Sequence, residues 1–147
     1  MKKFFTEADI AEIDRLNHLL HRKMIQDPFE NHYPRLKELS SIEISILRIL
    51  TEEPEAMPTD IARSIGVSKS TLTSAINRLE NRAYIKREIS PKDRRSFLLT
   101  LTEEGKLTQG EHLSFERELY IRLLGLMGNK DETALFLALA AKIVEGF

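Results

Sequence analysis

Short polar and basic side chains concentrate in the middle of this 147-residue sequence, where their types and spacing suit the binding of a polyanion. Hydroxyl and amide groups on one helix face can donate to and accept from base edges, because the major groove of DNA admits one helix. Lysine and arginine groups bind phosphates, which positions a protein without reading the base sequence. The predicted DNA-binding residues are Ser68, Lys69, Ser70, Thr71, Thr73, Ser74, Asn77, Arg78, Lys86, Asp93, Arg94 and Arg95.

The predicted base readers are side chains that a helix beginning after Ser68 would expose on its polar face. They are Ser70, Thr73, Ser74 and Asn77. Asn77 could pair bidentately with adenine, because its amide both donates and accepts. The predicted phosphate contacts are Lys69, Arg78, Arg82 and Lys86. The alternative is a polar helix face that is merely solvated.

A second basic group occupies a turn further along the chain. Arg94 and Arg95 could enter the narrow minor groove, where negative potential is concentrated. Asp93 would be unfavourable near phosphates unless it holds a neighbouring arginine in place, which a carboxylate does well. The alternative is a turn whose basic groups only improve solubility.

The charge of the whole chain conceals this segregation. The chain has 22 Lys and Arg residues against 23 Asp and Glu residues, a net charge of −1, which taken alone argues against nucleic acid. Residues 63–95, however, hold nine basic and three acidic groups, a charge of +6, and the remainder carries −7. We therefore expect an acidic body with one basic segment.

Two helices are predicted before the basic segment. Apolar residues recur at steps of three and four over residues 5–25, which indicates a long amphipathic helix. A second helix should begin at Ser40, where Ser40 and Glu43 have the spacing of a capping box, and end before Pro54.

The basic segment itself predicts two helices. Pro58 suits the first turn of one helix, which Gly66 ends. Ser68 is a favourable N-cap for the next helix. Its apolar side should comprise Leu72, Ala75, Ile76, Leu79 and Ala83.

The pattern then changes to that of strands. Residues 84–89 and 96–101 are rich in β-branched, aromatic and aliphatic side chains, with turn-forming residues between them, which predicts a β-hairpin with a basic tip. Thr102 should cap a long helix that extends to Gly128-Asn129, and Asp131 should cap a last helix that runs to Phe147.

These elements predict a mainly α fold with a small β-hairpin wing, a winged helix-turn-helix with N- and C-terminal dimerisation helices. Residues 1–147 should form a single domain. Within it, residues 1–37 and 105–147 should supply the dimerisation helices, and residues 38–104 the DNA-binding lobe. Residues 134–144 are apolar nearly all round, and one chain of this size offers little to cover them, so we expect a homodimer.

Several motifs resemble those of the MarR family of winged-helix transcription regulators. They are residues 40–50, Gly66-Val67-Ser68-Lys69-Ser70-Thr71-Leu72-Thr73, Arg78-Leu79-Glu80, Asp93-Arg94-Arg95 and Leu101-Thr102-Glu103-Glu104-Gly105. The resemblance covers nearly the whole chain and is closest over residues 39–105. Its most specific part is the Asp-x-Arg wing followed by Leu-Thr-x-x-Gly.

The resemblance implies a homodimer that binds a palindromic operator in double-stranded DNA, and commonly a small-molecule effector, phenolic or otherwise aromatic, between the two lobes. It also implies that Arg95 enters the minor groove and that Asp93 supports it. Phe29, Tyr33 and Phe115 are candidate residues of an effector pocket, although they are equally plausible as core residues.

Two positions depart from the family pattern. Ala83 stands where the recognition helix usually ends in glycine, so a left-handed cap there would be strained. Met57 stands where a capping serine or threonine is usual. Both departures bear on local stability rather than on a predicted DNA contact.

Other classes of site find little support. The chain has no cysteine, which excludes a disulfide framework, a thiolate metal site and thiol-based sensing. A zinc site that combines His18 and His21 with Glu111 or His112 is conceivable, but isolated histidines on a helix face are more often surface residues. We see no phosphate-binding loop, nucleophile elbow or triad, and expect no cofactor, no catalytic residue and no enzyme.

We expect a cytoplasmic protein, because neither a signal peptide nor an apolar run of bilayer length is present. The predicted function is a transcription regulator, acting as a repressor. The alternative is a winged helix that binds only protein, without sequence-specific DNA binding.

Overall fold

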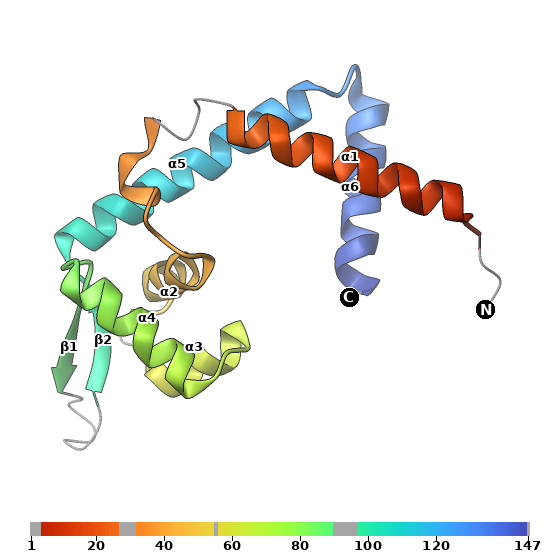
Figure 1. Ribbon diagram of the computed structural model, residues 1–147. Coiled ribbons are helices and arrows are strands. Elements are labelled where there is room, and N and C mark those ends of the chain that lie inside the picture. Colours follow the sequence, from red (N-terminus) through yellow and green to blue (C-terminus); the bar gives the residue numbers. More distant parts are fainter. Residues whose placement is uncertain (1–3, 27–31, 55, 90–96, 147) are drawn as a thin grey trace. The chain divides into compact units, whose positions relative to one another are not determined.

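The computed structural model describes residues 4–26, 32–54, 56–89 and 97–146. Residues 1–37 and 38–147 form two compact units, and each is described by itself. The first unit contains helix α1 and the short 3-10 helix η2 (Pro34–Leu36), and the other elements belong to the second (Figure 1). Within the described residues, no helix is long and apolar enough to cross a membrane.

Helix α1 (Glu7–Gln26) is the predicted amphipathic helix. Thr6 and Asp9 cap the start of the helix with two reciprocal hydrogen bonds. The Thr6 N–H donates to Asp9 Oδ2 at 2.7 Å, and the Asp9 N–H donates to Thr6 Oγ1 at 3.3 Å. Its apolar side chains remain exposed, from 36% at Leu19 to 70% at Ile13. Such a stripe requires a covering surface.

Helix α2 (Ser41–Glu52) opens the second unit with the predicted capping box. The Glu43 N–H donates to Ser40 Oγ at 3.3 Å, and the Ser40 N–H donates to Glu43 Oε2 at 2.8 Å. Two backbone donors that a helix start leaves unpaired are thereby satisfied. Glu43 is nevertheless only 1% exposed, which is unusual for a capping carboxylate.

Helices α3 (Pro58–Ile65) and α4 (Lys69–Asn81) form the predicted helix-turn-helix. Met57 stands at the N-cap of α3 and makes no side-chain capping bond. Gly66 ends α3 in the left-handed region at φ +69°, which glycine adopts without a steric penalty. Ser68 then caps α4, as predicted, by accepting from the Thr71 N–H.

The prediction for the apolar side of α4 was wrong at one position. Its helical members, Leu72, Ala75, Ile76 and Leu79, are buried, but Ala83 lies beyond the helix end and is exposed. Ala83 has a positive φ of +58°, so the left-handed cap exists without glycine. The Ala83 N–H donates to Glu80 O and the Tyr84 N–H to Leu79 O, both at 2.9 Å. These bonds close the helix end at the cost of strain in Ala83.

The wing is a two-stranded antiparallel hairpin of β1 (Ile85–Ile89) and β2 (Phe97–Leu101). In the register, Ile85 lies opposite Leu101 and Ile89 opposite Phe97. Because strand side chains alternate between two faces, Ile85 and every second residue after it lie on the face that packs on the core. The turn that carries the predicted basic tip falls outside the described residues.

Helix α5 (Glu103–Gly125) is capped by Thr102, as predicted. Helix α6 (Lys130–Gly146) follows. The predicted cap of α6 was wrong, because Asn129 and not Asp131 occupies the capping position. Asn129 Oδ1 accepts from the N–H groups of the second and third residues after it, both at 3.0 Å.

The buried core of the second unit joins α2, α3, α4 and the wing. Its members are Ile46, Leu47, Leu50, Ile61, Ala62, Leu72, Ala75, Ile76, Leu79, Ile85 and Leu99. Helix α5 meets the base of the wing at Gly105, where a Cβ would lie 2.0 Å from the Tyr84 carbonyl oxygen. Only glycine permits this approach.

Candidate nucleic-acid interface

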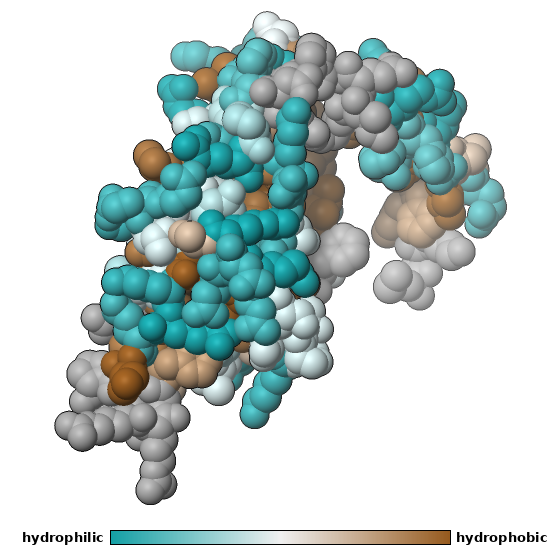
Figure 2. Space-filling model, turned by 60° about the vertical axis from the view of Figure 1, so that its left-hand side comes forward, coloured by the Kyte–Doolittle hydropathy of each residue, from teal (hydrophilic) through white to brown (hydrophobic). Residues whose placement is uncertain are grey.

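The outward face of α4 brings the predicted base readers together. Ser70, Thr73, Ser74 and Asn77 are all exposed on this helix, whereas the opposite face is buried in the core. Figure 2 turns the left-hand side of Figure 1 toward the reader, and hydrophilic side chains cover most of the surface there. The sequence pattern therefore predicted the exposed face of α4 correctly.

The hydroxyl groups of this face are held by the helix backbone. Thr73 Oγ1 donates to Lys69 O at 2.8 Å, and Ser74 Oγ donates to Ser70 O at 3.0 Å. A hydroxyl that donates to the backbone still has lone pairs with which to accept. Thr73 and Ser74 in this state are therefore suited to accept from donors on base edges.

The hydroxyl groups at the start of α4 are engaged with one another. Ser68 Oγ accepts from the Thr71 N–H at 3.1 Å and lies 2.9 Å from Ser70 Oγ and 2.8 Å from Thr71 Oγ1. This end of α4 presents backbone N–H groups and the positive end of the helix dipole, which together attract an anion such as phosphate. Lys69 is exposed beside it.

Arg78, a predicted phosphate contact, belongs to an ion-pair cluster centred on Glu43. Arg78 Nε donates to Glu43 Oε1 at 3.0 Å, while half of the Arg78 side chain remains exposed. Arg82 Nη1 lies 3.6 Å from the same oxygen and donates to Glu38 O at 2.9 Å. Glu43 thus links the N-cap of α2 to the last turn of α4 and fixes where α4 sits on the lobe.

The electrostatics of Glu43 favour its ionised form. Burial raises the pKa of this carboxyl, but hydrogen bonds from the Ser40 hydroxyl and backbone and the ion pair with Arg78 lower it by more. The pKa therefore lies below its usual value of 4.5. Neutral donors of Ser40 bind one carboxylate oxygen and the charged Arg78 binds the other, so this buried carboxylate is stable as an anion.

Asn77 is bound by a residue that the sequence analysis did not place in the site. Arg87 Nη2 donates to Asn77 Oδ1, and Arg87 Nε lies 3.3 Å from Glu80 Oε2. The guanidinium also lies over the ring of Phe97, 5.1 Å from its centroid. Two strands and the recognition helix therefore meet at one side chain.

Lys86 lies on the opposite side of strand β1 from Arg87, because neighbouring side chains alternate. Its Nζ is 2.5 Å from Glu88 Oε1, two residues along the same strand. The predicted contacts Asp93, Arg94 and Arg95 lie outside the described residues.

The sequence contains partial signals for Arg87 and for the further role of Glu43. Arg87 stands two positions after the buried Ile85 in an alternating strand, so it lies on the same face of the strand as Ile85. Glu43 is the third residue of a helix and its neighbours in sequence are apolar, so a carboxylate there, buried with them, is favoured by further hydrogen-bond donors besides Ser40.

Two of the histidines, His18 and His112, each lie near an acidic side chain of their own helix. Groups of three or more His, Cys, Asp or Glu side chains that could hold a metal ion are absent from the described ranges. His18 Nε2 lies 3.5 Å from Asp14 on the exposed surface of α1. His112 is 7% exposed on α5, with its Nε2 3.6 Å from Glu116 Oε1.

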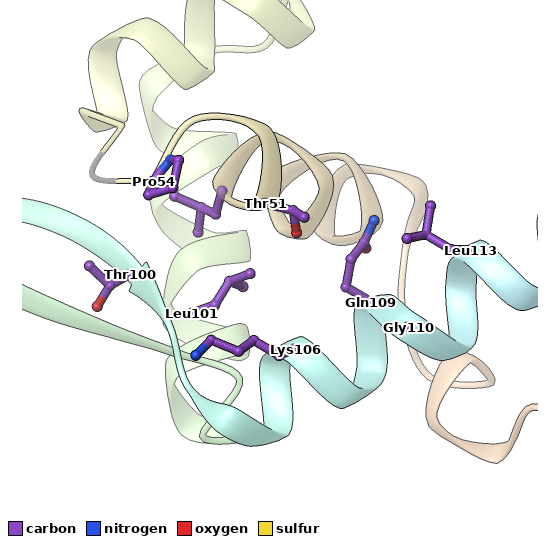
Figure 3. A pocket seen from close by; sticks show the side chains of 9 residues that line it. Thr51, Pro54, Thr100, Leu101, Lys106, Gln109, Gly110 and Leu113 are labelled. Carbon is purple, nitrogen blue, oxygen red and sulfur yellow. The ribbon is translucent and has the colours of Figure 1, made fainter.

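A pocket of about 400 Å³ lies between α2, β2 and α5 (Figure 3). Its lining residues are Leu50, Thr51, Pro54, Thr100, Leu101, Lys106, Gln109, Gly110 and Leu113. Gln109 Oε1 and Thr100 Oγ1 are buried and have no hydrogen-bond partner in the described part of the protein. Of the aromatic residues predicted for an effector pocket, Phe115 is not among these lining residues, Tyr33 belongs to the other unit, and Phe29 falls outside the described residues.

Comparisons with known proteins agree with this architecture. Residues 39–97 match the model of the MarR family. The chain is 26% identical over 139 residues to YwhA of Bacillus subtilis (strain 168), an uncharacterised HTH-type transcriptional regulator, with 95% of this chain and 99% of YwhA covered.

Solved structures show the same fold. YusO from Bacillus subtilis has a TM-score of 0.74 at 22% identity, covering 97% of this chain and 99% of that chain. FabT of Streptococcus pneumoniae, solved in complex with DNA, has a TM-score of 0.71 at 23% identity, covering 90% and 95%. At such identities the likeness establishes the winged helix-turn-helix fold alone. The match of residues 39–97 to the MarR family model and the similarity to YwhA along nearly the whole chain agree with this fold, so the winged helix-turn-helix lobe of this chain is similar to that of MarR-family transcriptional regulators.

Proposed function

We propose that this protein is a repressor that binds a pseudo-palindromic DNA operator as a homodimer. The observation that carries the proposal is the outward face of α4, where Ser70, Thr73, Ser74 and Asn77 are exposed beside basic side chains. Such a face suits the major groove, in which short polar side chains reach base edges and cations meet phosphates.

The wing supplies the second contact in this proposal. Its basic tip would follow the backbone to the adjacent minor groove, where Arg95 would insert and Asp93 would orient it. FabT, which has a similar fold, was solved in complex with DNA, and this supports DNA binding by the present chain.

Dimer formation is proposed from apolar surface that the chain leaves uncovered. On α6, Leu135, Leu137, Leu139, Ile143 and Val144 are at least half exposed, and none of the residues of this helix is buried. Helix α1 carries a similar exposed stripe. Covering both stripes with a second copy would remove them from water. On a pseudo-palindromic operator, the two recognition helices of the proposed dimer would enter successive major grooves about 34 Å apart.

Salt dependence tests the DNA-binding proposal. Fragments selected from the source genome are titrated with protein by fluorescence anisotropy, and the affinity should fall on the order of 10³-fold between about 50 and 200 mM salt. Lys69→Gln should lower the slope of this dependence by about one unit. Arg15→Gln removes the same charge from the exposed Arg15–Glu12 pair of α1 and serves as the matched control.

Failure to bind any fragment at low salt would favour the alternative, a winged helix that binds only protein. Sedimentation equilibrium tests the dimer separately, because a monomer at micromolar concentration contradicts it.

We further propose that a phenolic or other aromatic effector binds the pocket between α2, β2 and α5. Its walls are largely apolar, while Gln109 Oε1 and Thr100 Oγ1 offer two buried hydrogen-bond acceptors. Lys106 borders the pocket as a cation. A ligand that prefers the free protein to the DNA-bound protein would release the operator.

A panel of phenolic and aromatic compounds tests this proposal. An effector should raise the melting temperature and weaken operator binding, and Gln109→Leu should abolish both effects while leaving operator binding without the compound intact. Compounds that act equally on the wild type and on Gln109→Leu would place the effector elsewhere.

A further inference from the structure

We propose that Arg87 is a specificity-determining residue, which acts by holding the Asn77 amide in one orientation on the recognition helix. This inference depends on the proposed DNA binding by α4. It assigns Arg87 a positioning role, through Asn77, rather than a contact of its own with a base.

The chemistry of the two groups fixes the orientation of the amide. A guanidinium has five N–H donors and no acceptor, so only the oxygen of an amide can face it. The contact between Arg87 Nη2 and Asn77 Oδ1, at 2.5 Å, therefore sets Oδ1 toward the wing and leaves Nδ2 on the other side. An exposed asparagine without this partner could rotate its amide by half a turn at little cost.

Arg87 is itself held from three directions. Arg87 Nε lies 3.3 Å from Glu80 Oε2, and Arg87 Nη2 donates to Asn77 Oδ1. The ring of Phe97 lies against the guanidinium. Asn77 and Glu80 are three positions apart and so lie on the same side of α4, facing β1. Only about a third of the Arg87 side chain is exposed.

Strand alternation explains why Arg87 and not its neighbour has this role. Ile85 and Arg87 share the face of β1 that looks toward the core and α4, and Ile85 is buried there. Lys86 lies on the opposite face and pairs with Glu88. Of these two adjacent cations, only Arg87 is therefore on the side of β1 from which it can contact Asn77.

A fixed amide orientation should sharpen the preference of Asn77 for one base. An asparagine that pairs with adenine must accept from N6 and donate to N7, and the flipped amide would set donor against donor and acceptor against acceptor. One lone pair of Oδ1 remains available while Arg87 uses the other. Fixing the amide excludes the flipped arrangement, so the preference for one base should be sharper than that of a free asparagine.

The test compares base preferences among sequences selected by the purified proteins from a randomised duplex library. For the wild type, we expect a preference of roughly 5- to 150-fold for one base at the position where Asn77→Ala abolishes that preference. Arg87→Gln should reduce the preference at that same position to nearly the level of Asn77→Ala, because glutamine can face either end of the amide. Arg87→Lys can donate but not accept, and should retain part of the preference.

The matched control is Lys86→Gln, which removes the same charge from the same strand. It should weaken binding to all sequences alike, as expected for a phosphate contact. The double variant Arg87→Gln with Asn77→Ala should lose no more preference at this position than Asn77→Ala alone. Melting curves establish that each variant is folded. Where Arg87→Gln fails to fold, Arg87→Lys is compared instead, and its expected result is a partial loss of preference confined to this position.

Three outcomes would overturn the inference. They are an unchanged preference in Arg87→Gln, a loss spread evenly over all positions as in Lys86→Gln, and additive losses in the double variant. A wild-type protein that selects no sequence would refute the proposed DNA binding itself, and this result is distinguishable from the other three.

Discussion

Replacing Glu43 by glutamine perturbs the point at which α2 holds the recognition helix. Each carboxylate oxygen of Glu43 accepts from donors: Oε2 from the Ser40 N–H and hydroxyl at 2.8 and 2.6 Å, and Oε1 from Arg78 Nε at 3.0 Å. Glutamine has one acceptor oxygen and one NH₂ group, so its NH₂ must face a donor on one side or the other.

The expected cost follows from these contacts. At least one hydrogen bond is lost at a site that is 2% exposed, which costs about 1–3 kcal/mol, and the remaining bonds lose their charge-assisted strength. The half-exposed Arg78 regains solvation, so the full penalty of a stranded buried charge does not apply. We expect a loss of about 2–3 kcal/mol and, for a chain of this length, a fall in melting temperature of about 5–10 °C.

Thermal denaturation followed by circular dichroism at pH 7 provides the measurement. The matched control is Glu52→Gln on the same helix, where Glu52 forms an exposed pair with Arg48 at 3.1 Å. Exposed pairs of this kind contribute little, so the control should melt close to the wild type. Equal melting temperatures for the two variants would refute the role assigned to Glu43.

The same carboxylate predicts a dependence of stability on pH. The pKa of Glu43 is lower in the folded chain than its usual 4.5, so its contribution is present above that value and is lost as the pH falls through the folded pKa. Below pH 4.5, the wild type should therefore lose stability more steeply than Glu43→Gln. Parallel curves of melting temperature against pH for the two proteins would contradict this.

Three further predictions concern other positions. Ala83→Gly should stabilise the chain by about 0.5–1 kcal/mol, because relief of the left-handed strain at φ +58° exceeds the added entropy of the unfolded chain; a lower melting temperature would contradict it. Gly105→Ala should destabilise by about 3 kcal/mol, because the new Cβ would lie 2.0 Å from Tyr84 O, whereas Gly110→Ala meets nothing within 4 Å and should not destabilise. Arg95→Ala should weaken operator binding by about 1–3 kcal/mol in an anisotropy titration if it enters the minor groove, and an unchanged titration would remove it from the site.

Local rules predicted most of the elements of this fold. Capping residues located the starts of α2, α4 and α5 at Ser40, Ser68 and Thr102, because hydrogen bonds to a helix start involve residues only three apart. The same locality explains the error at α6, where Asn129 and Asp131 are both good caps and only the backbone path decides between them.

The end of α4 shows the limit of periodicity. Ala83 continues the apolar spacing of the helix, and this spacing alone does not reveal that the chain leaves the helix two residues earlier. The left-handed turn is imposed by the entry into β1 and the burial of Ile85. A propensity cannot detect a conformation that distant packing enforces.

The sequence by itself determined the exposed polar face of α4, because the helical repeat alone decides which side chains share a side. It also determined the segregation of charge that singled out residues 63–95. The tertiary structure alone decided which cations pair with which partners. Arg78 meets Glu43 across 35 positions of sequence and Arg87 meets Asn77 across ten, and such encounters depend on how helices and strands pack, which no local spacing encodes.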